Sequence, residues 1–96
     1  MAKLRTLKKD IDYLVNEVAY DCYLALYFNP DKYSEIVAIM EEAVDLRNNL
    51  FELANNPADK HNASLVRKHY AFVHQQMFEK IDDLFVKLSE ATKIGK

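Results

Sequence analysis

The chain has 96 residues, with one glycine, two prolines, one cysteine and a formal net charge of −2. Its length corresponds to one domain, residues 1–96. The scarcity of glycine, proline and β-branched residues favours helices over a sheet with tight turns. General nucleic-acid binding is disfavoured because it needs a basic surface.

The first helix is predicted over about residues 3–28, where apolar residues recur at helical spacing. Its expected core stripe is Leu4, Leu7, Ile11, Leu14, Val18 and Ala25. On the opposite face, polar residues give way to tyrosines along the helix. Between residues 18 and 28, ten of eleven residues are apolar or aromatic, so no polar face remains. We expect this half to be covered on all sides, by other helices of the chain, a second copy or a partner.

Two Asn-Pro steps, Asn29-Pro30 and Asn56-Pro57, divide the chain. Asparagine is a favoured N-cap and proline a favoured first helical residue, while proline disfavours helical geometry in the residue before it. Each step can therefore end one helix and start the next. A second helix is predicted over about 31–55. A third ends near 92 and begins either at 58, directly after Pro57, or at 63, after a cap at Asn62.

The second and third predicted helices also carry apolar stripes. These stripes are Ile36, Ile39, Ala43, Leu46, Leu50 and Leu53 in the second helix, and Val66, Tyr70, Val73, Met77, Ile81, Leu84, Leu88 and Ala91 in the third. Short connections make successive helices antiparallel neighbours. The sequence therefore predicts an all-α, antiparallel, up-down-up bundle of three long helices, which we expect to pair into a larger helical bundle as a homodimer.

Most catalytic and cofactor-binding motifs are missing from the sequence. Phosphate-binding loops need several glycines, and thiolate zinc sites need paired cysteines. His69 and His74 are five residues apart, on opposite sides of the apolar stripe, so we interpret them as boundary residues with hydrogen-bonded rings. Cys22 lies in an apolar part of its helix, where burial raises the pKa of a thiol and makes it inert. We expect no cofactor, no metal site and no enzymatic activity.

A set of polar residues beside the core is expected to form a buried cluster. Glu17 and Asp21 are four residues apart on one flank of the first helix, and Arg47 lies within the apolar stripe of the second. Folding the helices as hairpins places Arg47 within reach of Glu17 or Asp10, and Gln76 near Asp21. Because buried charges are normally paired, we interpret Glu17, Asp21, Arg47 and Gln76 as structural. The alternative is a carboxylate metal site with enzymatic activity.

Five of the six tyrosines fall between residues 13 and 33. Tyrosine has an apolar ring and a polar hydroxyl, and it is enriched in protein interfaces. We expect Tyr20, Tyr23, Leu24, Tyr27 and Phe28 to form a self-association surface, most simply a twofold one. Two alternatives stay open. The tyrosines could be partly exposed on a monomer, or they could line a small-molecule pocket with Asp21 or Gln76 as the polar anchor.

The predicted function is that of a non-enzymatic, homo-oligomeric interaction or scaffold module, with another protein as a possible partner. A cytoplasmic location is expected. The basic residues near the start are followed by Asp10 and Asp12, where a signal peptide needs an apolar segment. No apolar run approaches the roughly 18 residues needed to span a bilayer, and a single cysteine suits a reducing compartment.

Overall fold

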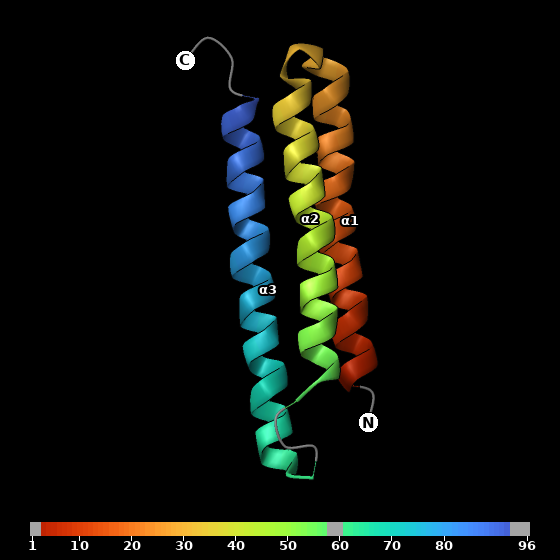
Figure 1. Ribbon diagram of the computed structural model, residues 1–96, viewed down its shortest axis with the longest axis vertical. Coiled ribbons are helices and arrows are strands. Elements are labelled where there is room, and N and C mark those ends of the chain that lie inside the picture. Colours follow the sequence, from red (N-terminus) through yellow and green to blue (C-terminus); the bar gives the residue numbers. More distant parts are fainter. Residues whose placement is uncertain (1–2, 58–60, 93–96) are drawn as a thin grey trace.

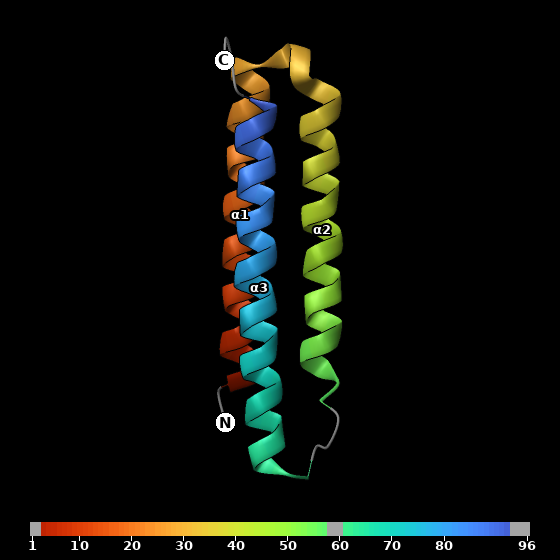
Figure 2. The same cartoon turned by 90° about the vertical axis from the view of Figure 1, so that its left-hand side faces the viewer.

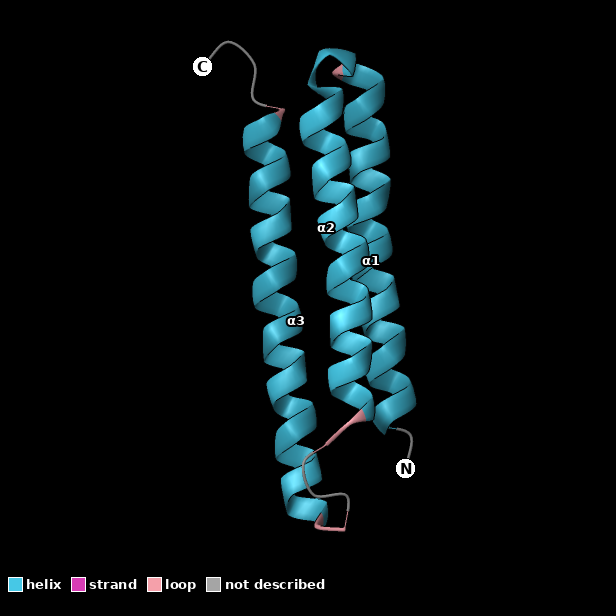
Figure 3. Cartoon of the chain, viewed as in Figure 1, coloured by secondary structure: helices cyan, strands magenta, loops and turns pink. Residues whose placement is uncertain are grey.

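Three long helices run side by side along one axis (Figure 1). The computed structural model describes residues 3–57 and 61–92. Helix α1 spans Lys3–Phe28, α2 spans Tyr33–Asn55 and α3 spans Ala63–Ala91, and a short 3-10 helix, η1 (Pro30–Lys32), joins α1 to α2. The described elements are helices linked by short loops (Figure 3). Helices α1 and α3 point in the same direction and α2 in the opposite one, which confirms the predicted up-down-up bundle.

The bundle is a thin rod that measures 53 × 20 × 16 Å. Helix α3 is displaced along the rod relative to the other two. It begins below the lower end of α2 and stops before the level of the α1–α2 turn (Figures 1 and 2). The end of α1 therefore extends past the last turn of α3, and Phe28 in the last turn of α1 is 71% exposed.

The core is a single line of apolar side chains between the three helices. It consists of Leu7, Ile11, Val15, Val18 and Cys22 from α1, Ile36, Ile39, Ala43, Leu50 and Ala54 from α2, and Val73, Met77, Ile81, Leu84 and Leu88 from α3. Two details differ from the predicted stripes. Val15 is buried, because α1 contacts two neighbours and its buried stripe widens toward α2. At the last turn of α2, Leu53 from the predicted stripe is 39% exposed, and Ala54, predicted beside that stripe, faces the core instead.

Both Asn-Pro steps end helices. The Asn29 side chain donates to the Ala25 carbonyl at 3.1 Å, while Pro30 starts η1. The Asn56 side chain similarly donates to the Glu52 carbonyl at 2.7 Å. The predicted N-cap role is thus wrong for both side chains, because each turns back to satisfy a carbonyl of the helix it terminates. Asn62 caps α3 by accepting from the Leu65 amide at 3.2 Å, which settles the start of α3 at Ala63.

We expect Ile36→Ala to lower the free energy of unfolding by about 2–4 kcal/mol, because it opens a cavity in the thin core. Ile36 is fully buried. Val44→Ala is the matched control, since Val44 lies on the same helix and is 55% exposed. Urea denaturation followed by circular dichroism measures both changes. Similar losses for the two variants would show that Ile36 is not part of a shared core.

Candidate interaction surface

The outer side of α1 carries an exposed group of large apolar and aromatic side chains. We call it the tyrosine face, and it consists of Tyr13, Tyr20, Tyr23, Leu24, Tyr27 and Phe28. Tyr20 is 61% exposed, Tyr23 71% and Tyr27 79%. The rings of Tyr27 and Phe28 contact each other edge to face, with centroids 5.0 Å apart. All six side chains lie on one continuous helix, so the backbone holds them in fixed relative positions.

The inner side of the same helix is covered by the rest of the bundle. Val18 and Cys22 have no exposed surface, although each lies within two residues of an exposed tyrosine. Helices α2 and α3 therefore cover one side of α1 and leave the tyrosine face open. The expectation that residues 18–28 are covered on all sides is not met by the described part of this chain. Any cover for this face has to come from outside these residues.

An open groove of about 520 Å³ lies between α1 and α3, next to the tyrosine face. Leu24 and Phe28 from α1 and Phe85 from α3 give it apolar walls, and Asp21 lines it as well. Asp21, one of the two polar anchors predicted for a tyrosine-lined pocket, is thus found in a groove of different lining. Gln76 and the tyrosines of α1 do not line this groove. A second groove, between the end of α1 and α2, contains Tyr33 and has a volume of about 490 Å³.

The expected buried polar cluster does not form. Arg47 Nε donates to Asp12 Oδ1 at 2.6 Å, and both side chains are about half exposed. Folding α1 and α2 as a hairpin predicted the correct level of Arg47 along α1. Asp10, however, lies on the side of α1 that faces α3, where its carboxylate accepts a hydrogen bond from His74 Nε2 at 3.3 Å. Glu17 is exposed. The sequence did not identify Asp12 as the partner of Arg47, because counting residues gives the position of a side chain along the helix but not its direction around the helix axis.

The expected Asp21–Gln76 contact is also wrong. The Asp10–His74 pair shows that residues of α1 and α3 at the same level differ by 64 in number. Asp21 is therefore level with Phe85, and both line the α1–α3 groove. Gln76 lies roughly 13 Å away along the axis, at a rise of about 1.5 Å per residue. The difference arises because α3 is displaced along the rod (Figure 1).

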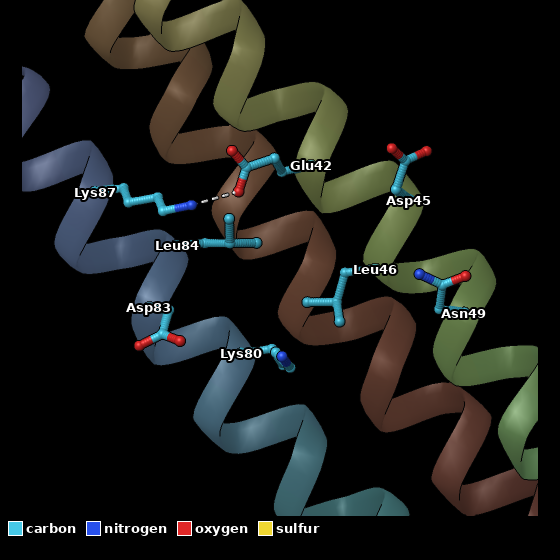
Figure 4. A pocket seen from close by; sticks show the side chains of 8 residues that line it. All are labelled: Glu42, Asp45, Leu46, Asn49, Lys80, Asp83, Leu84 and Lys87. Carbon is cyan, nitrogen blue, oxygen red and sulfur yellow. Dashed lines mark hydrogen bonds and ion pairs between the residues drawn. The ribbon is translucent and has the colours of Figure 1, made fainter.

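A polar groove separates α2 from α3 (Figure 4). Lys87 Nζ donates to Glu42 Oε1 at 2.8 Å across it, and this bond raises the pKa of the Lys87 ammonium. Asp45 and Asn49 from α2 and Lys80 and Asp83 from α3 line the rest of the polar surface. The acidic side chains of α2 face both lysines of α3, and α3 also contributes the acidic Asp83, so the groove is a solvated polar contact between the two helices.

Both histidines of α3 make hydrogen bonds across the bundle, as predicted. His69 Nε2 donates to the Leu53 carbonyl at 2.5 Å, and His74 contacts Asp10. Among the described residues, no group of three histidine, cysteine, aspartate or glutamate side chains is placed to hold a metal ion. The Glu17–Asp21 pair is thus without a third ligand in this part of the chain.

Comparison with known proteins gives no relationship on which to base a function. No protein-family model matches the chain, and searches of the curated proteins and of the solved structures give no significant match. Within residues 3–57 and 61–92, no helix has an apolar stretch long enough to cross a membrane. The tyrosine face is accordingly the candidate site on structural grounds alone.

Arg47→Leu should leave the melting temperature close to that of the parent, whereas Arg47→Ala should lower the free energy of unfolding by about 1 kcal/mol. The guanidinium lies 4.3 Å from the centroid of the Phe51 ring, so the side chain packs as well as pairs. Leucine keeps the apolar cover and alanine removes it. Thermal denaturation compares the two variants, and equal melting temperatures would refute a packing role for Arg47.

Cys22 should react slowly with a thiol reagent in the folded protein and rapidly in denaturant. Its side chain is fully buried, and burial followed by the nearby Asp21 charge raises the pKa of the thiol. A raised pKa leaves less thiolate at any given pH, and thiolate is the reactive form. Colorimetric thiol labelling at neutral pH, with and without denaturant, measures the difference. Equal rates would contradict the burial of Cys22.

Proposed function

We propose that this chain is a non-enzymatic interaction module that works by self-association through the tyrosine face. The observation that carries the proposal is the exposure of Tyr20, Tyr23 and Tyr27 on a helix whose other side is fully packed. Aromatic residues of this kind are the commonest hot spots of protein interfaces. A thin bundle with a modest core also gains stability when a second copy covers an exposed apolar surface.

A second copy is the simplest cover for this surface, because closed twofold dimers are the commonest oligomers. The tyrosine face lies on one helix and contains exposed rings that can pack against those of a second copy. In the proposed role, dimerisation brings together whatever else the two copies bind, as a scaffold does. The proposed setting is the cytoplasm, where the free and buried Cys22 stays reduced.

The α1–α3 groove supports a second candidate function, the binding of a small apolar or aromatic molecule. Its volume falls within the usual range for ligand sites, and Asp21 supplies one polar group among apolar walls. This role would be supported by a fluorescent apolar dye that binds the parent protein but does not bind a Phe85→Ala variant.

Tyr23→Glu should weaken the dimer by at least about thirtyfold, because it places a charge in the centre of an apolar contact. Light scattering and sedimentation across a dilution series measure the mass of the parent and of the variant. Tyr33→Glu is the matched control, since Tyr33 is 62% exposed and lies outside the tyrosine face. An unchanged dimer in Tyr23→Glu places the interface elsewhere. A parent that stays monomeric at high concentration refutes self-association, and a different protein then becomes the partner to seek.

A further inference from the structure

The groove between the end of α1 and α2, which we call the α1–α2 groove, follows α2 along its length. Leu26 of α1 lines it together with an apolar strip from α2, which consists of Tyr33, Val37, Met40 and Val44. The strip advances in steps of four, three and four residues, so its members lie on one face of the helix. From Tyr33 to Val44 it extends roughly 16 Å, at a rise of about 1.5 Å per residue. The lining is therefore a strip along a helix and not a compact pocket.

The apolar strip is open to solvent. Tyr33 is 62% exposed and Val44 is 55% exposed, while Met40 also packs against the core of the bundle. Alternating steps of three and four residues are the spacing with which one helix packs against another. A small ligand would cover only part of a strip of this length, whereas a helix of about 12 residues, or three turns, matches it. The shape of the lining therefore indicates a helical occupant.

The charged residues that line the α1–α2 groove are both acidic. They are Glu41 and Asp45, and both are exposed. Within residues 3–57 and 61–92, neither carboxylate takes part in an ion pair, whereas the neighbouring Glu42 pairs with Lys87. Asp45 also lines the polar groove between α2 and α3, but it makes no ion pair with Lys80 there. The α1–α2 groove therefore combines an apolar floor with two carboxylates whose charge the described residues leave uncompensated.

We propose that the α1–α2 groove binds a basic amphipathic helix of a partner protein. The apolar side of that helix covers the strip on α2, and its lysine or arginine side chains reach Glu41 and Asp45. The two carboxylates are four residues apart on one helix and repel each other, so a cation between them is favourable. Nucleic acids and anionic membrane surfaces carry negative charge, which these carboxylates oppose. This site is separate from the tyrosine face and does not depend on self-association.

A synthetic peptide tests the proposal. The probe has about two heptads, with leucine at the a and d positions, lysine elsewhere and a fluorophore at one end. One control peptide has the same composition with its leucines out of heptad spacing, and a second has glutamate in place of lysine. Fluorescence anisotropy should show that the full-length protein binds the probe at least about tenfold more tightly than either control. Equal binding of either control, or no saturable binding of the probe, overturns the proposal.

Matched substitutions on the protein separate the groove from general attraction between opposite charges. Glu41→Gln should weaken binding of the probe about two- to fivefold at low ionic strength, and less in salt. Glu52→Gln should not, because Glu52 is exposed on the same helix but lies outside the groove. Val44→Asn should weaken binding about threefold or more, whereas Val86→Asn, at a 48% exposed position of α3, should not. Equal losses in either matched pair overturn the proposal.

Methionine methyl groups give an independent readout of where the peptide binds. Met40 lines the groove, and Met77 is fully buried in the core. In protein with isotope-labelled methionine methyls, the probe should shift the NMR signal of Met40 and leave that of Met77 nearly unchanged. Saturable binding without a change at Met40 places the peptide elsewhere and overturns the proposal. A Met40 signal that shifts with protein concentration alone shows that a second copy fills the groove, which also overturns it.

Discussion

A rod of three helices can bury one stripe of each helix, and this geometric constraint governs the rest of the structure. The bundle is only 16 Å across in its narrowest direction, so its core is a single line of side chains. Val18 and Cys22 lie in that line with no exposed surface. Residues on the far side of the same helix are outside this core and are not covered by the described residues of the chain. The tyrosine face exists because α1 has more apolar residues than three helices can cover.

The way the helices end reinforces this constraint. The Asn29 side chain closes the last turn of α1 by bonding to the Ala25 carbonyl, and η1 then directs the chain into α2. The turn is therefore compact, and it leaves Tyr27 and Phe28 on a regular helix up to its last residue. Helix α3 stops short of that level (Figure 1). The exposed aromatic residues are consequently presented by a well-formed helix, which reduces the entropy lost when they are covered.

Helix number, direction and approximate boundaries were predictable from the sequence because apolar spacing and the two Asn-Pro steps report local preferences. The start of α3 was open, since both Pro57 and Asn62 could begin a helix, and the bond from Leu65 to Asn62 decides between them. Side-chain partners were less predictable. Arg47 pairs with Asp12 because of the rotation of α1 about its axis, and Asp21 misses Gln76 because α3 is shifted lengthwise. Rotation and shift depend on packing among all three helices, which no single stripe specifies.

The crowding of tyrosines on one side of α1 also has an optical consequence. The chain has no tryptophan and six tyrosines, four of which belong to the tyrosine face. Ultraviolet absorption and intrinsic emission of the folded protein therefore come mainly from that one surface. Whatever covers it will change the polarity around those rings and the hydrogen bonds of their hydroxyls. The molecule thus carries a native spectroscopic reporter on the surface proposed for self-association, and no extrinsic label is needed to follow it.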